Sequence, residues 1–248
     1  MGPDLSTPER RSNGRAPFGF SRVVFLSHVL AQESPAFPGD PVVEIDAATT
    51  LERDGYYLQR LTCGEQSGTH WAAPAHFSPA GLTADELEPA DFFFAAVILD
   101  HRAQAIADPD FTVSTADLER WEAAHGQIPE RAAVLLLCGY DQHWNNPRAY
   151  LGTDENGSLH YPGFGAAAAR WLVERRGIGA LGTDTMGIDS GRDPAFAANR
   201  LLLSGHRIHL ENLRGLAEMP AAGGWIVVGG VRPRAGSGSP ATVFGLVP

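Results

Sequence analysis

The chain has 248 residues, of which 44% are hydrophobic, and a formal net charge of −10 at pH 7. This length and apolar content allow one large globular domain with a sizeable buried core. The negative charge argues against a nucleic-acid partner and against docking on an anionic membrane, because both call for clustered basic side chains. All 19 basic residues are arginines, which excludes lysine Schiff-base chemistry and a P-loop lysine.

The N-terminus and the cysteines bear on where the protein works. The first 17 residues carry no apolar segment of the kind found in signal peptides. We predict a disordered arm over 1–17 and a single domain over 18–248. Cys63 and Cys138 lie far apart and form neither a CxxC motif nor a disulfide framework, so both are predicted to be small buried hydrophobes. We therefore expect a reducing, cytoplasmic location and no membrane-spanning segment.

The first half of the domain is predicted to consist mostly of strands. A β-branched apolar run predicts a strand at 22–30, and the turn sequence FPGDP follows at 37–41. Alternating apolar and polar residues predict half-buried strands at 41–50 and 56–63. The continuous apolar run at 92–100 predicts a strand buried on both faces.

Strands and helices alternate in the second half. Ser114 and Asp117 predict the start of a helix that ends at Gly126. Further predictions are a strand at 132–140, a helix at 165–177, a strand at 178–184, a helix at 194–205, a strand at 224–233 and a loop at 235–241. This order indicates one α+β domain. The G-x-G-x-x-G match at 177–182 ends a helix and opens a strand, the reverse of a dinucleotide-binding fingerprint, so we do not interpret it as a nucleotide site.

One short stretch carries a family resemblance. Residues 66–76 read QSGTHWAAPAH, with His70 and His76 six residues apart. The stretch resembles the signature H-x-G-T-H-x-D-x-P-x-H of the cyclase-like hydrolases, the family of bacterial kynurenine formamidase and isatin hydrolase. Later segments such as WEAAHGQIPERAAVLLLCGYD and GALGTDTMGID are similar to the family in order and spacing. The resemblance implies a swivelling β/β/α domain of the α+β class and a homodimer or higher homo-oligomer.

The resemblance also implies a depleted metal site. The family's ligands are the first two His and the Asp of the signature, a downstream His, and a Glu twelve residues after that His. In this chain these positions hold Gln66, His70, Ala72, Asn199 and Glu211. Because amides are poor zinc ligands and a methyl group is none, only two good ligands remain, and we predict no metal and no cofactor.

The expected site is a pocket for a small organic substrate, polar at one end and aromatic elsewhere. The predicted catalytic residues are His70, His76 and Glu211. The predicted substrate-binding residues are Gln66, Thr69, Trp71, Phe77, Trp144, Tyr161, Met186 and Asn199.

Several of these residues also have an ordinary structural interpretation. His70 and His76 could serve only as hydrogen-bonding groups of a buried loop, and Glu211 could pair with an arginine such as Arg207. Asp184 and Asp189 are interpreted as structural caps. His206 and His209 are interpreted as solvated residues at the ends of a strand.

Three functions follow from this pattern. The first is a metal-independent cyclase of polyketide or polyether metabolism, similar to ring-forming members of the family. Such a pocket would hold a flexible unsaturated chain in a reactive conformer for cycloaddition or conjugate addition. The second is a metal-dependent amide or lactone hydrolase, and the third is an inactive ligand-binding relative. The lost ligand positions favour the first.

Overall fold

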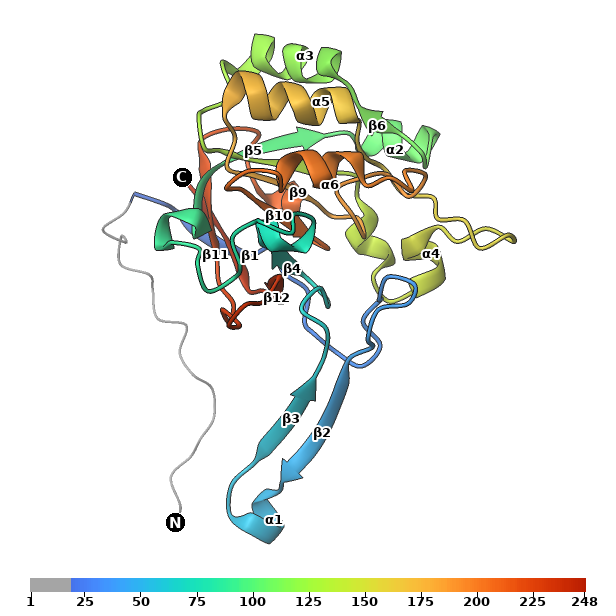
Figure 1. The fold of residues 1–248 in the computed structure, drawn as a ribbon, viewed down its shortest axis with the longest axis vertical. Helices are drawn as coiled ribbons and strands as arrows, with labels where there is room; N and C mark the ends of the chain where they lie inside the picture. The colour runs from blue at the N-terminus through green and yellow to red at the C-terminus, as the bar shows by residue number, and fades with distance from the viewer. Residues whose placement is uncertain (1–18) are drawn as a thin grey trace.

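A computed structural model describes residues 19–248, so the arm predicted at 1–17 lies outside the described residues (Figure 1). The strands are β1 (Arg22–Phe25), β2 (Glu44–Thr49), β3 (Leu58–Thr62), β4 (His70–Ala72), β5 (Phe93–Asp100), β6 (Thr112–Val113), β7 (Ala133–Leu137), β8 (Gly163–Phe164), β9 (Ala180–Thr183), β10 (Ile208–Glu211), β11 (Gly224–Val228), β12 (Gly238–Pro240) and β13 (Val243–Val247). The helices are α1 (Leu51–Asp54), α2 (Arg102–Ala107), α3 (Thr115–His125), α4 (Pro147–Leu151), α5 (Ala166–Trp171) and α6 (Ala197–Leu202).

The main sheet has the strand order β1-β13-β11-β5-β7-β9-β10-β4-β12. Its centre, from β5 through β7 and β9 to β10, is parallel, and the strands on both sides of that centre pair antiparallel. Helices α3, α5 and α6 lie over one face of the sheet (Figure 1). The α+β class predicted from the sequence is confirmed, with a curled sheet rather than separate layers.

The central strands are buried on both faces, as their continuous apolar runs predict. Every residue of β7 is buried, and side chains alternate between two apolar clusters. Leu135 packs into the cluster that contains Trp71 and Phe94, whereas Val134 and Leu136 pack into the cluster under the helices. Successive strand residues point to opposite faces, which explains this division.

Helix ends largely follow their sequence signals. Ser114 and Asp117 form the predicted reciprocal cap at the start of α3. A π-helical turn over Leu172–Arg176 extends α5 to the left-handed cap at Gly177. Helix α6 is shorter than the predicted 194–205, because Phe196, in the left-handed region, precedes its first turn.

The prediction of half-buried strands at 41–50 and 56–63 is wrong in its burial. Within residues 19–248, strands β2 and β3 pair only with each other, and they project from the sheet with α1 at the tip (Figure 1). All five residues of β3 are exposed, including Leu58 and Leu61. The alternation of residue types therefore marks strands correctly but does not show what covers their apolar face.

The prediction of a plain loop at 235–241 is also wrong in part. Within it, β12 pairs antiparallel with β4 and forms one edge of the sheet. Glycine and serine have low strand propensity, but pairing with a buried neighbour overrides it. Pro240 is tolerated there because an edge strand leaves one row of its backbone groups outside the ladder.

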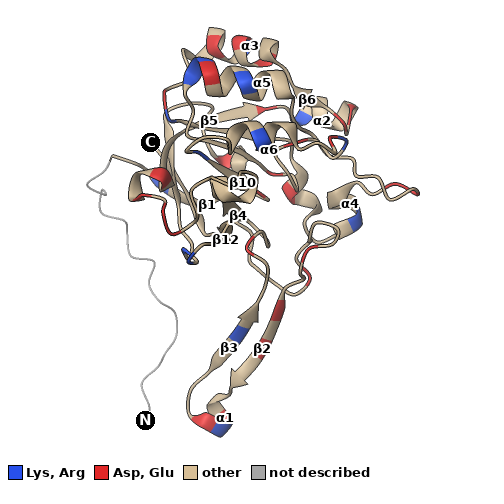
Figure 2. Cartoon of the chain, in the orientation of Figure 1, with Lys and Arg blue, Asp and Glu red and all other residues tan. Residues whose placement is uncertain are grey.

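Charged side chains are spread over the helices and the projecting hairpin, with both signs interspersed in the view of Figure 2. No helix in residues 19–248 combines the length and the apolar character needed to cross a membrane.

The hydrogen bonds of the Asp184 carboxylate allow a test of what holds the end of β7 in place. Asp184 follows β9, and its carboxylate accepts hydrogen bonds from the amides of Cys138, Gly139 and Tyr140, at 2.8, 2.6 and 3.2 Å. Asp184→Ala removes the acceptor from three amides at the end of β7, so we expect a loss of at least about 3 kcal/mol in the free energy of unfolding. Urea denaturation measures this change.

The matched control is Asp100→Ala, which removes an exposed carboxylate that pairs with the exposed Arg102. We expect that change to cost less than about 1 kcal/mol. Equal losses in the two variants would show that the three amide hydrogen bonds of Asp184 contribute little.

Candidate active site

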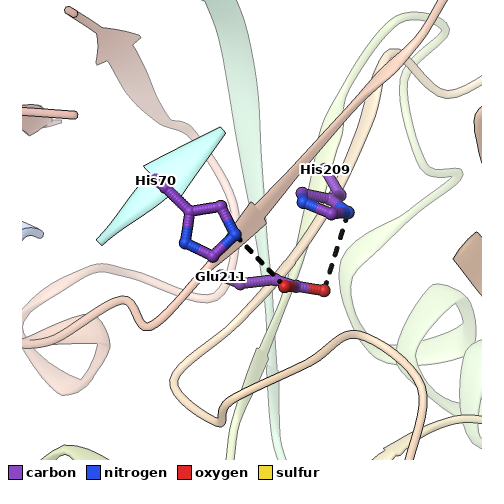
Figure 3. Close-up of side chains that lie close together, drawn as sticks. All are labelled: His70, His209 and Glu211. Carbon is purple, nitrogen blue, oxygen red and sulfur yellow. Dashed lines mark ion pairs between the residues drawn. The ribbon is translucent and has the colours of Figure 1, made fainter. Parts of the chain in front are cut away.

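The pairing of β4 with β10 sets the geometry of the site. The two strands run antiparallel, with Glu211 opposite His70 and His209 opposite Ala72. Side chains alternate along a strand, so His209 and Glu211 point to the same face of β10, the face on which His70 lies. Figure 3 shows the three side chains converging from these neighbouring strands.

The same register places Trp71 elsewhere. Trp71 lies between His70 and Ala72 and therefore points to the opposite face of the sheet. It is fully buried in the apolar core, and its ring meets the edge of Phe92 at a centroid distance of 5.1 Å. Predicted as a substrate-binding residue, Trp71 is placed by the structure in the core and not at the cavity.

A cavity of about 210 Å³ opens beside this cluster. It brings together eight of the predicted site residues: Gln66, His70, His76, Phe77, Tyr161, Met186, Asn199 and Glu211. Sequence reasoning missed Phe37, Asp40, Gly187 and Phe196 as lining residues, because nothing in their local pattern marks them. It also misread His209, which was interpreted as solvated.

The structure corrects the interpretation of His209. Its side chain is 1% exposed and lines the cavity, since it occupies an inward position of a strand whose four residues are all buried. The spacing His-x-Glu at 209–211 was the available signal, because two residues apart on a strand means the same face. His206, by contrast, is largely exposed and bonds Asp91 at 2.7 Å.

Thr69 and Trp144 support the cavity from behind. The hydroxyl of Thr69 accepts a hydrogen bond from the amide of His28 at 2.9 Å and bonds the carbonyl of Asn212. Trp144 stacks on His28 with ring centroids 3.9 Å apart and packs beside Tyr150. Neither residue is among those that line the cavity.

Burial and neighbouring groups set the charges of the cluster. Burial lowers the pKa of His209 to about 3, so this imidazole is neutral at pH 7. Burial alone would raise the pKa of Glu211, but His209, His70 and the amide of Ile188 outweigh it and bring that pKa to about 2. Burial also lowers the pKa of His76, although Glu211 opposes this shift. The cavity therefore presents an ionised carboxylate beside neutral imidazoles.

Glu211 does not pair with Arg207, whose guanidinium donates to the carbonyl of Ile178. Its Oε2 lies 3.3 Å from Nε2 of His70, and its Oε1 accepts a 2.8 Å hydrogen bond from the amide of Ile188.

The interpretation of Asp189 as a cap agrees with the structure, because its carboxylate accepts hydrogen bonds from the amides of Ala198 and Asn199 at the start of α6.

The cluster of His70, His209 and Glu211 has the composition of a metal site. One ligand atom from each residue lies within 4.8 Å of the other two. Two imidazoles and one carboxylate match the three protein ligands of many catalytic zinc sites. A divalent ion held there would polarise a carbonyl or lower the pKa of a bound water. The count of two good ligands from the signature alone therefore underestimates what the fold brings together.

Comparisons with known proteins agree with this architecture. The family model described as putative cyclase matches residues 24–190. Isatin hydrolase of Roseibium aggregatum is 31% identical over 93% of both chains, and kynurenine formamidase of Erythrobacter litoralis is 24% identical over 77% of this chain and 79% of that protein. The solved structure of isatin hydrolase A from Ralstonia solanacearum superposes with a TM-score of 0.86, at 29% identity and 92% coverage of each chain. The chain belongs to the putative cyclase family, and the similar curated proteins are hydrolases.

His28, which stacks on Trp144, allows a test of how burial behind the cavity affects stability. Burial, and then Arg214, lower the pKa of His28 to about 4. Between about pH 6.5 and 4 the unfolded chain binds a proton at His28 and the folded chain does not, so stability falls as the pH falls through this window. His28→Phe keeps a stacking ring and should flatten that part of the stability–pH curve.

Urea denaturation at several pH values between 7 and 4 measures the effect. His125→Gln, an exposed histidine at the end of α3, is the control and should leave the slope unchanged. An identical slope in wild type and His28→Phe would contradict the assignment of His28 as a half-buried histidine that is neutral in the folded protein.

Proposed function

We propose that this chain is a hydrolase that cleaves the C–N bond of a cyclic amide or of a formamide on an aromatic molecule of one or two rings. The observation that carries the proposal is one cavity with an ionised Glu211 and histidines at one end and the rings of Phe37, Phe77 and Tyr161 elsewhere. The hydrolases among its relatives support the same reaction class.

The size of the cavity supports a compact substrate. An apolar cavity of roughly 150 Å³ holds a single benzene ring. The 210 Å³ of this cavity leave space for a second small ring. The comparisons with known proteins favour a hydrolase over the polyketide cyclase that the sequence analysis expects.

Gln66 favours a substrate that carries an N–H group. Its Nε2 donates to Oγ of Ser237 at 3.1 Å, and that hydroxyl donates in turn to Glu65 at 2.6 Å. This chain of donors fixes the amide so that Oε1 is the free end, and Oε1 is buried without a partner among the described residues. A substrate N–H would satisfy this acceptor, whereas a lactone has none to offer.

His76 is the candidate for proton transfer. It lies on the short 3₁₀ turn after β4, and its ring stands 5.8 Å from that of His209, edge to face. Because its pKa is lowered, the neutral imidazole can accept a proton from a water that attacks the carbonyl carbon. The same proton then passes to the leaving nitrogen as the C–N bond breaks, so one water is consumed and an acid and an amine are formed.

The test offers the purified protein isatin and, separately, the formamide of kynurenine, each with and without added zinc or manganese. Product that is heavier than isatin by one water, or loss of the formyl group, is the expected result by mass spectrometry. His76→Ala should lower kcat/KM by at least about 100-fold, because the proton acceptor is removed. His125→Gln should leave the rate unchanged.

Two results would contradict the proposal. One is the absence of hydrolysis of both compounds and of a panel of related lactams, imides and formanilides under all metal conditions. The other is a hydrolytic rate that is the same in wild type and in His76→Ala, with folding verified by circular dichroism.

A further inference from the structure

We propose that His70, His209 and Glu211 bind one divalent transition-metal ion, with His209 as a ligand and Asn199 as the residue that orients it. The proposal concerns ion binding by the free protein, so it stands or falls independently of the reaction proposed above. Four observations on this cluster support it.

The spacing of the cluster matches a metal centre. Nε2 of His70 lies 3.3 Å from Oε2 of Glu211. Ligands that bind zinc tetrahedrally at about 2.1 Å stand roughly 3.4 Å apart, which is close to this separation. One ring nitrogen of His209 lies within 4.8 Å of the ligand atoms of both other residues.

Contacts at Nδ1 orient the ring of His70 toward Glu211. Nδ1 lies 2.9 Å from the carbonyl oxygen of Gly68 and 3.4 Å from Nδ2 of Asn212. Gly68 adopts φ +63, and a Cβ there would come within 2.7 Å of Leu30, so the position requires glycine. Nε2, the other ring nitrogen, faces the carboxylate of Glu211 at 3.3 Å. A metal ion or a proton held between these two atoms would bind to both of them.

His209 is held in the form that binds metals. Nδ2 of Asn199 donates to Asp189 at 2.9 Å, which fixes the amide so that its Oδ1 faces Nδ1 of His209 at 2.6 Å. Nδ1 of His209 therefore carries the proton, and Nε2 carries the lone pair. Nε2 is buried and has no partner among residues 19–248. In Figure 3 this second ring nitrogen lies on the side of His209 that faces His70.

The charge and space around the cluster suit a single ion. Glu211 offsets one of its two positive charges, and Asp189 stands behind Asn199 with a second carboxylate. Ala72, the cross-strand partner of His209, has a small side chain that leaves room for the imidazole. Three protein ligands beside an open cavity leave a further coordination position for water or substrate.

The competing explanation is a proton shared between His70 and Glu211 with no metal. The decisive experiment titrates chelator-treated full-length protein with Zn²⁺, Mn²⁺ and Co²⁺ by calorimetry, and records the absorption spectrum of the Co²⁺ form. We expect one ion per chain. His209→Gln should weaken binding at least about 100-fold, and Asn199→Ala roughly 10-fold or more without a change in stoichiometry.

His125→Gln, an exposed histidine, is the matched control and should bind as the wild type does. Because a ligand variant can fail to fold, X-ray absorption at the zinc edge on the unaltered protein should independently show two imidazoles in the coordination shell. Failure of all three ions to bind, binding in His209→Gln equal to wild type, or a shell with one imidazole would each overturn the proposal. None of these outcomes depends on whether isatin or any other compound is hydrolysed.

Discussion

The antiparallel register of β4 against β10 is the constraint on which the rest of the site depends. With Glu211 opposite His70, three polar side chains must share one face and Trp71 must lie on the other. A shift of β4 by one residue would put Trp71 into the cavity and His70 into the apolar core. Burial of Trp71 and Leu210 in that core therefore stabilises the same register that assembles the site.

A second layer of contacts then determines which atoms of the site are free. The carbonyl oxygen of Gly68 faces Nδ1 of His70, and the side-chain oxygen of Asn199 faces Nδ1 of His209. The start of α6 binds Asp189, and Asp189 in turn fixes Asn199. The fold thus directs two imidazole rings and a carboxylate toward one small volume. Through Asp189 and Asn199, the start of α6 thus fixes the orientation of His209 on β10.

Many of the strands and helices could be predicted from the local sequence. The predictions that were wrong depend on contacts between distant parts of the chain. The strand at 92–100 and the helix from Ser114 to Gly126 were predictable because apolar periodicity and capping residues are local. The projecting hairpin was not predictable in its burial, because the exposure of Leu58 and Leu61 depends on what the rest of the chain covers. Strand β12 was missed because only its pairing with β4, far away in sequence, overrides its glycine and serine.

The site residues also divide into those that the sequence could predict and those that it could not. The family resemblance led to His70 and His76 in the signature and to Asn199 at the downstream ligand position, and the cavity contains all three. It could not lead to His209, because His209 does not occupy any of the family's ligand positions. A comparison of ligand positions along the sequence counts only the residues at those positions. In the folded chain, β10 places a further imidazole, that of His209, beside His70 and Glu211. Phe37 and Phe196 join the cavity wall from distant segments and leave no mark in their local sequence.

The most direct test of this account is the position of a bound ion. A crystal grown from zinc- or manganese-loaded protein should show one anomalous-scattering peak in contact with Nε2 of His70, Nε2 of His209 and the carboxylate of Glu211. A peak bound by Gln66 or Asn199 in place of His209, or no peak in this cavity at high occupancy of the loaded metal, would contradict the claim that β10 supplies two of the three ligands.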